Sequence, residues 1–437
     1  MALFSSHSSV TGDIRHGAGG ATLASELKAR GLIEQSSAAP ERIFDKPRTA
    51  YLGIDPTADS LHVGHLVPVL AMKRLGDAGN KLLFLVGGGT GMIGDPKEKG
   101  ERPMLDEKTV AANTRALKGQ FKNLLGRTPF KMVDNADWLM GVKLVPFLRD
   151  IGKHFTVNEL VKREIIKKRL DNPDDSISYT EFTYSLLQGF DYLTLHKEHG
   201  CDLQIGATDQ WTNILSGVDL TRKKAGDEVY GFTVPLVTDS TGKKFGKSEG
   251  NAIWLDPKKT SPFKFYQFWI NLPDDGLETY LRVYTFLPVA EIDALIELHH
   301  RKPGNRQAQE TLARLVTEIV HGPAVTAQVV AATDALFGDT SFAELSREAR
   351  QVALAEAPSV TLAKKDLEAG VSLAETIVTG GLASSKSDAR RLIEGKGVTL
   401  SGLPIENPSQ ELHTHDLPGG YALIRKGKQG VLILVLK

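Results

Sequence analysis

Cysteine is almost absent from this chain of 437 residues, which contains only Cys201. One cysteine cannot form an intramolecular disulfide, so a disulfide-stapled secreted domain is excluded and a reducing cytosol is expected. A zinc site is disfavoured too, because no third ligand follows His62 and His65 at a recognisable spacing. We therefore predict a cytoplasmic protein with no metal site of its own.

Long apolar runs and an excess of charge of one sign are also lacking. Apolar stretches such as 81–86 and 431–436 have the length of strands, so no membrane span is expected. Lys+Arg and Asp+Glu each total 53, so a nucleic-acid partner would have to meet a local basic patch. Residues 1–20 lack the apolar core of a signal peptide. We expect a disordered leader there, with a targeting segment as the weaker alternative.

What the sequence does contain is an alternation of strand and helix patterns. Short apolar strands are predicted near 50–54, 81–86, 203–206 and 229–237, with helices between them. This order predicts an α/β fold with a doubly wound parallel sheet, whose ligands lie at the carboxyl ends of the strands. The predicted domain boundaries are a catalytic Rossmann-like domain with a helical insertion over 21–250, a helical domain over 251–336, a linker over 337–370 and a small α+β domain over 371–437.

Residues 51–65 organise the first domain as a strand, a turn and a helix start. Pro68 lies in the helical pattern and is tolerated only in the first helical turn, so the helix should begin near Gly64. His62 and His65 then lie at the helix mouth, where unpaired N–H groups favour an anion. We predict a nucleotide triphosphate site, and an ordinary capped junction with two surface histidines remains the alternative.

Two glycine-rich segments resemble phosphate loops only in part. Residues 89–94 match Gly-x-Gly-x-x-Gly, but Asp95 and Pro96 follow where a dinucleotide site requires a helix. In 241–248 the spacing between Gly242 and Gly246 is too short for a Walker loop. The second segment is better explained as a lysine-bearing loop that closes over a polyphosphate.

Polar residues on one helix face mark a second candidate site. Tyr184, Gln188 and Asp191 are spaced to share one face of a helix predicted over 178–195. Such groups are costly to bury without partners, so they indicate a ligand site unless the stripe is exposed. The strand near 203–206 likewise ends in polar residues, including Asp209 and Gln210.

Basic residues cluster in the last domain, where they suit phosphate contacts with RNA. They lie in a predicted helix and in a turn between the last two strands: Lys386, Arg390, Arg391, Arg425, Lys426 and Lys428.

His62-Val63-Gly64-His65 and Lys244-Phe245-Gly246-Lys247-Ser248 together resemble the two signatures of class I aminoacyl-tRNA synthetases. The segments 51–62, 91–96, 184–191 and 209–211 narrow the resemblance to the bacterial-type tyrosyl-tRNA synthetases. The likeness runs from about residue 21 to the C-terminus, and the last domain is similar to S4-like RNA-binding domains. The chain departs from the family pattern at Pro68, Ala207, Thr208 and Thr212. These departures are expected to change binding affinities but not the activity.

The resemblance implies that the enzyme activates L-tyrosine with ATP and Mg²⁺ and transfers it to tRNA(Tyr). It also implies a homodimer and a tRNA-facing role for the helical domain. The residues it implies for the substrate tyrosine are Tyr51, Asp95, Tyr184, Gln188, Asp191 and Gln210. Those for ATP are Gly53, Asp55, Thr57, His62, Gly64, His65, Asp209, Lys244 and Lys247, with His62, His65, Lys244, Lys247 and Ser248 acting in catalysis.

Two other classes of function remain open. A related class I synthetase or nucleotidyltransferase would share the histidine and lysine segments, although Tyr51 and Asp191 argue against it. A catalytically inactive RNA-binding relative would need only the last domain, and the intact motifs argue against that.

Overall fold

The computed structural model describes residues 22–96, 105–238, 245–248, 251–338, 340–427 and 430–437. Lys244, Lys428 and the expected leader lie outside this set, and the side chains of Lys247 and Ser248 are not described. The chain divides into two compact units, residues 1–260 with 272–312 and residues 261–271 with 313–437. No helix in the described part of the chain is both long and apolar enough to cross a membrane.

The first unit contains a six-stranded sheet in the order β1-β6-β5-β2-β3-β4. Neighbouring strands are parallel except β1 and β6, which confirms the predicted doubly wound sheet. The chain fills one side of β2 first and then crosses to β5 on its other side. This change of direction creates the crevice in which such sheets bind ligands. The strands are β1 Gln35–Ser36, β2 Thr49–Ile54, β3 Lys81–Val86, β4 Phe130–Asp134, β5 Leu203–Ala207 and β6 Tyr230–Val234.

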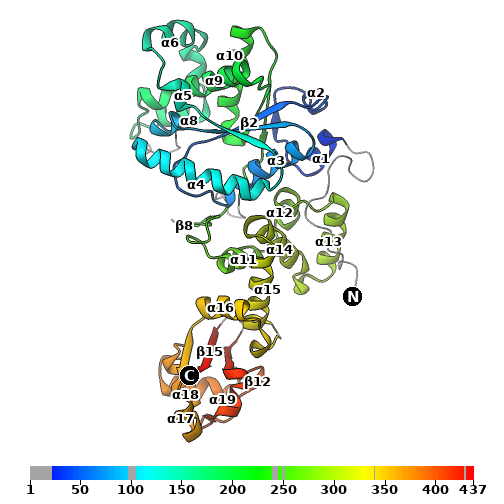
Figure 1. The fold of residues 1–437 in the computed structure, drawn as a ribbon, viewed down its shortest axis with the longest axis vertical. Helices are drawn as coiled ribbons and strands as arrows, with labels where there is room; N and C mark the ends of the chain where they lie inside the picture. The colour runs from blue at the N-terminus through cyan, green and yellow to red at the C-terminus, as the bar shows by residue number, and fades with distance from the viewer. Residues whose placement is uncertain (1–21, 97–104, 239–244, 249–250, 339, 428–429) are drawn as a thin grey trace. The chain divides into compact units, whose positions relative to one another are not determined.

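Helices cover both faces of this sheet (Figure 1). Helix α3 (Leu66–Asp77) lies so close to one face that a Cβ on Gly76 would be 2.7 Å from Leu82. Leu83 and Leu85 point to the other face and pack against α9 (Tyr179–His199), beside which α10 lies. The remaining helices of this unit are α1 Leu23–Ala29, α2 Pro40–Ile43, α4 Glu107–Leu125, α5 Ala136–Leu139, α6 Leu144–Asp150, α7 Val157–Leu160, α8 Glu164–Leu170, α10 Trp211–Ala225, α12 Leu277–Tyr284 and α13 Val289–Arg301.

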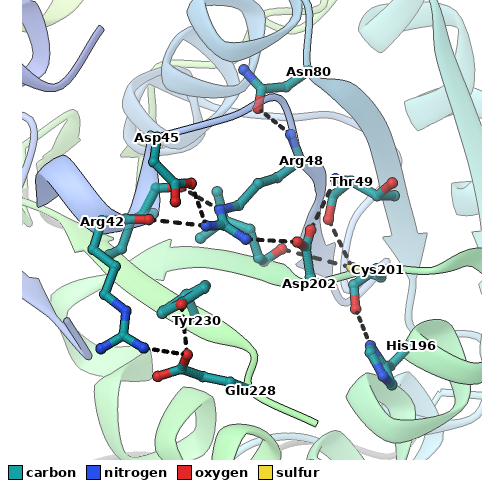
Figure 2. A network of polar contacts seen from close by, with 12 residues as sticks. Arg42, Asp45, Arg48, Thr49, Asn80, His196, Cys201, Asp202, Glu228 and Tyr230 are labelled. Carbon is teal, nitrogen blue, oxygen red and sulfur yellow. Dashed lines mark hydrogen bonds and ion pairs between the residues drawn. The ribbon is translucent and has the colours of Figure 1, made fainter. Parts of the chain in front are cut away.

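A polar network fastens the amino ends of three strands, away from the ligand edge (Figure 2). Buried Arg48, just before β2, forms 2.8 Å ion pairs with Asp45 and Asp202. Asp202 also accepts from the Thr49 N–H, and Asn80 accepts from the Arg48 N–H. Because Asp202 and Asn80 directly precede β5 and β3, these bonds fix the register of the central strands.

The helical domain predicted over 251–336 is divided in the structure. Its helices form, but residues 272–312 belong to the first unit, while 261–271 and 313–336 belong to the second. Helix α14 (Gln307–His321) contains the point of division, and α11 (Pro262–Ile270) packs against α15 (Pro323–Phe337) within the second unit. Helical periodicity alone could not show which helices share a core.

The second unit also contains a five-stranded sheet in the order β12-β11-β14-β15-β9. Residues 337–370, expected to be a linker, hold α16, β9 and α17 instead, and β9 pairs in parallel with β15. Val360 and Leu362 of β9 pack on the core formed by this sheet and its helices, which explains why the segment is ordered. The elements are α16 Arg347–Glu356, β9 Ser359–Leu362, α17 Lys364–Ala369, β10 Val371–Ser372, α18 Leu373–Thr379, α19 Lys386–Glu394, β11 Val398–Leu400, β12 Leu403–Pro404, β13 Glu411–Leu412, β14 Tyr421–Lys426 and β15 Gly430–Leu436.

Candidate active site

The two histidines meet at the mouth of α3, as predicted. His62 caps a short 3₁₀ turn, Val63–His65, which His65 ends, and Pro68 falls in the first turn of the α-helix that follows. Nδ1 of His62 accepts from the Gly64 N–H at 3.0 Å, and Nδ1 of His65 accepts from the His62 N–H at 3.2 Å. With both Nδ1 atoms accepting, each neutral ring carries its proton on Nε2, which can donate to a phosphate oxygen. The ring centroids are 3.9 Å apart, so the two donors form one site.

The end of the lysine loop packs on this turn. Ile253 donates a 3.0 Å hydrogen bond to the Gly246 carbonyl and accepts one of 2.9 Å from the Val63 N–H. Gly246 has φ +76°, and a Cβ there would be only 3.1 Å from Val63. Glycine is therefore needed for this close approach, which brings β7 (Lys247–Ser248) and its partner β8 (Asn251–Ala252) beside the histidines.

The glycine-rich segment after β3 makes room for carboxylates. A Cβ on Gly87 would be 2.0 Å from Asp55 Oδ1, and one on Gly88 would be 2.1 Å from Asp134 Oδ1. Asp55 also accepts from Thr90 Oγ1 at 2.8 Å, and Asp134 accepts from the Gly88 N–H at 3.1 Å. Gly87 and Gly88 therefore serve close packing at the carboxyl ends of β2, β3 and β4.

The polar face of α9 is turned inward, so the exposed-stripe alternative is wrong. Tyr184 and Asp191 are 6% and 1% exposed, and Gln188 is half-buried. The Tyr184 hydroxyl donates to Asp55 Oδ2 at 2.9 Å, which links α9 to the end of β2.

Asp191 is a buried carboxyl group held by two donors. Asn135 Nδ2 and Trp138 Nε1 donate to its two oxygens at 2.9 and 2.8 Å. Burial raises the pKa of Asp191 to about 7, against the lowering effect of these two hydrogen bonds. Asn135 also accepts from the Gly89 N–H at 2.8 Å, so it joins the glycine-rich segment to the pocket.

Sequence reasoning missed Asn135 and Trp138. Both follow β4, a strand that the sequence analysis did not predict. The available signal was the mostly apolar stretch Phe130–Val133, followed at once by Asp134 and Asn135, since polar residues at the carboxyl ends of parallel strands line ligand sites.

Tyr51 supplies an unsatisfied polar atom next to Asp191. The side chain is fully buried, and its ring lies 5.1 Å from that of Tyr192. Its hydroxyl makes no hydrogen bond within the described residues. Burial raises the pKa of the Tyr51 phenol well above its ordinary value, and the nearby charge of Asp191 raises it further. A buried hydroxyl without a partner costs stability, which is expected where a ligand supplies the partner.

Asp95, Gln210 and Asn213 form a second polar cluster. Gln210 Nε2 donates to Asp95 Oδ2 at 2.8 Å, and Asn213 Nδ2 donates to Asp95 Oδ1 at 3.2 Å. Gln210 ends the 3₁₀ turn Thr208–Gln210 after β5, so this cluster also stands at the carboxyl edge of the sheet.

The residues implied for ATP differ in exposure from those implied for tyrosine. Gly53, Thr57, Gly64 and Asp209 are exposed, whereas Tyr51, Tyr184 and Asp191 are buried. The exposed group includes residues at the ends of β2 and β5 and at the α3 mouth, which is where a large polar ligand could enter.

The basic residues of the last domain fall into two classes. Lys386 pairs with Glu375, Arg391 pairs with Asp388 at 3.0 Å, and both basic side chains are exposed, as is Arg390. By contrast, Arg425 donates to the carbonyls of Leu336 and Ala335 at 3.0 and 2.9 Å, and Lys426 donates to that of Leu382 at 2.8 Å. Arg425 and Lys426 therefore also hold the end of β14 against these carbonyls, and their contact with RNA stays a prediction.

The family model of the class I tRNA synthetases (W and Y) matches residues 45–338, and that of the tyrosine–tRNA ligase SYY-like C-terminal domain matches residues 348–434. The chain is 44% identical to a tyrosine–tRNA ligase of Roseiflexus castenholzii, over 93% of this chain and 98% of that protein. It is 43% identical to a tyrosine–tRNA ligase 1 of Vibrio parahaemolyticus, over 93% and 97%. Among solved structures, a C-terminally truncated mitochondrial tyrosyl-tRNA synthetase of Aspergillus nidulans matches with a TM-score of 0.64 and 31% identity, over 73% of this chain and 96% of that one. The resemblance predicted from the motifs is confirmed, and the chain belongs to the tyrosine–tRNA ligases of the class I tRNA synthetases.

Proposed function

We propose that this enzyme activates L-tyrosine with ATP, forming tyrosyl-adenylate and pyrophosphate, and then transfers the tyrosyl group to the 3′ end of tRNA(Tyr). The tyrosine carboxylate is ionised at neutral pH and attacks the α-phosphorus directly, so the first step needs no protein nucleophile. The P–O bond to pyrophosphate breaks as the new P–O bond forms. Catalysis then depends on positioning and on stabilising charge in the transition state.

The observation that carries this proposal is the buried pair Tyr51 and Asp191. A hydroxyl that makes no bond within the described residues lies near a carboxyl group that still has lone pairs to offer. A substrate phenol between them would donate to Asp191 and accept from Tyr51. Such a pocket favours tyrosine over other aromatic amino acids, because phenylalanine leaves both groups unsatisfied.

The other site residues take roles that follow from their positions. We assign the substrate ammonium to Tyr184, Gln188 and Asp95, and the substrate carboxylate to the neighbourhood of Gln210. The Nε2 donors of His62 and His65 face the ATP phosphates at the α3 mouth. The ATP ribose is assigned to the exposed edge, with Gly53, Asp55, Thr57, Gly64 and Asp209, and the departing pyrophosphate to Lys244, Lys247 and Ser248.

Magnesium is proposed only as the ion that accompanies ATP. Within the described residues, no cluster of three or more His, Cys, Asp or Glu side chains could hold a metal ion. The chain therefore offers no cage for magnesium there, and no step above depends on a protein-bound ion.

A homodimer is supported by surface composition. In the first unit, most of the large apolar side chains that are exposed fall between residues 140 and 179, which is unusual for a surface that stays in water. They are Met140, Leu144, Val145, Leu148, Val157, Leu170 and Tyr179.

The second unit is proposed to bind tRNA through the exposed basic residues Lys386, Arg390 and Arg391 of α19, with Lys428 as a further contact.

The proposed location is the cytosol. Cys201 is a free, buried thiol, which suits a reducing compartment.

ATP–pyrophosphate exchange measured with each amino acid in turn tests the proposed function. Tyrosine alone should support rapid exchange, and the purified enzyme should then charge tRNA(Tyr). Exchange with tryptophan in place of tyrosine, or with none of the amino acids, would overturn the proposal.

A further inference from the structure

Arg163 is a charged residue that neither the motifs nor the proposed mechanism has used. It occupies the N-cap position of α8 without capping the helix through its side chain, which is half-buried. One guanidinium nitrogen, Nη1, donates to Asn213 Oδ1 at 3.1 Å, and another, Nη2, donates to Ser216 Oγ. Both acceptors are buried and lie one turn apart on α10.

Arg163 fixes the orientation of the Asn213 side-chain amide. A guanidinium has donors and no acceptor, so it can bond only the oxygen of that amide. The amide nitrogen is then turned away from Arg163, and it donates to Asp95 Oδ1 at 3.2 Å and to Gln210 Oε1 at 3.3 Å. With the amide reversed, the Asn213 oxygen would face the Asp95 carboxylate, and like partial charges would repel.

Because Asn213 bonds both groups, the positive charge of Arg163 lies close to the Asp95 carboxylate. Burial lowers the pKa of Arg163 to about 10, and the charge of Asp95 opposes that shift. Arg163 therefore remains protonated at neutral pH and can act only as a donor. Within the described residues no carboxylate forms an ion pair with it, so Asn213 and Ser216 of α10 are its structural partners.

We propose that Arg163 is a positioning residue for the substrate ammonium, acting through Asn213 on the carboxylate of Asp95. The inference rests on the proposed function, in which Asp95 receives that ammonium. Arg163 does not touch the substrate; it sets the rotamer of Asn213, which holds Asp95 and Gln210 at the end of the pocket opposite Tyr51.

The test compares two ligands that differ only in the group Asp95 recognises. L-tyrosine has an ammonium group, and 3-(4-hydroxyphenyl)propionate lacks it but keeps the phenol and the carboxylate. Arg163→Met should raise the KM for tyrosine in ATP–pyrophosphate exchange by about tenfold, the effect of one charge-assisted hydrogen bond. The inhibition constant of the deaminated analogue should change less than about twofold. Arg222→Met, which removes an exposed arginine of α10, is the matched control and should change neither value.

Conservative and double variants separate positioning from general stability. Arg163→Lys keeps a cation that can only donate, and it should recover most of the tyrosine affinity. Asn213→Ala should give the same selective loss, and adding Arg163→Met to it should cause little further change, because the two residues act in series. These variants also test the inference if Arg163→Met does not fold.

Equal weakening of both ligands, or no change in either, would overturn the positioning role. Full additivity of the two variants would overturn it as well. If the wild-type enzyme fails to activate tyrosine, the proposed function is wrong instead, and that result is read from the wild type alone.

Discussion

The Tyr184 hydroxyl donates a 2.9 Å hydrogen bond to Asp55 Oδ2, which ties the polar face of α9 to the end of β2. Asp55 was expected at the ATP ribose and Tyr184 at the tyrosine ammonium, so this bond joins the two halves of the proposed site. Asp55 accepts from Thr90 Oγ1 through its other oxygen, which fixes the carboxylate from both sides. The groups proposed to recognise the two substrates therefore share one hydrogen-bond network.

Tyr184→Phe should weaken tyrosine binding and leave ATP binding nearly unchanged. Removing the hydroxyl deletes one bond to Asp55 and one proposed contact to the substrate ammonium. The KM for tyrosine should rise by a factor that corresponds to about 1 kcal/mol of binding free energy, the net contribution of one hydrogen bond. Glu198→Gln is the control, because Glu198 lies on the same helix and is exposed. A rise in the KM for ATP alone would contradict the assignment.

Titration of Asp191 should lower the free energy of unfolding as the pH rises toward neutrality. Its pKa is about 7 in the folded enzyme, mainly because of burial, and about 3.9 in an unfolded chain. The folded state therefore binds the proton more tightly. This contribution to stability is fully present below about pH 4 and is lost as the pH rises through about 7.

The measurement is urea unfolding of the wild type and of Asp191→Asn between pH 5 and 8. The variant does not titrate, so its free energy of unfolding relative to wild type should improve by on the order of 2–3 kcal/mol over that range. Asp219→Asn, on the exposed side of α10, should show no such trend. A constant difference between Asp191→Asn and wild type would rule out the raised pKa.

Much of the site could be predicted from the sequence because it depends on local features, such as a helix start and the spacing of residues on one helix face. Pro68 and Gly64 fixed the start of α3, and the spacing of Tyr184 and Asp191 showed that they share a helix face. Arg163 could not be found this way, because its role comes from its contact with Asn213, which is far away in the chain. The position of Asn135 directly after β4 was a usable signal, but its contact with Asp191 could not be predicted from local features. Scattered Pro and Gly indicate a linker over 337–370, and β9 is too short to show a strand pattern before it pairs with β15 in the folded unit.

Lys247→Ala should slow adenylate formation far more than it weakens tyrosine binding. The loop lysines are proposed to meet charge that grows on pyrophosphate as it leaves, so their effect belongs to the transition state. The loss should be on the order of 2–4 kcal/mol, as for oxyanion-type donors. Single-turnover adenylate formation and equilibrium tyrosine binding measure the two effects, with the exposed Lys258→Ala as control. An unchanged single-turnover rate would remove Lys247 from the mechanism.

Truncation should separate activation from tRNA charging. A chain ending at Gly338 should still form tyrosyl-adenylate but charge tRNA poorly, since it lacks α19 and the C-terminal sheet. A chain ending at Gly370 should do the same but aggregate more, because β9 would lose its partner β15. Exchange, aminoacylation and light scattering measure these outcomes. Normal charging by the shorter chain would contradict the RNA-binding role.

The central claim is that Tyr51 and Asp191 recognise the substrate phenol. The most direct test is the ratio of kcat/KM for tyrosine to that for phenylalanine, measured by ATP–pyrophosphate exchange in wild type and in Tyr51→Phe. Tyr51→Phe removes the buried hydroxyl without opening a large cavity, so the ratio should fall by a factor that corresponds to about 1 kcal/mol. An unchanged ratio, together with intact tyrosine activation in Asp191→Ala, would contradict the account and place the phenol pocket elsewhere.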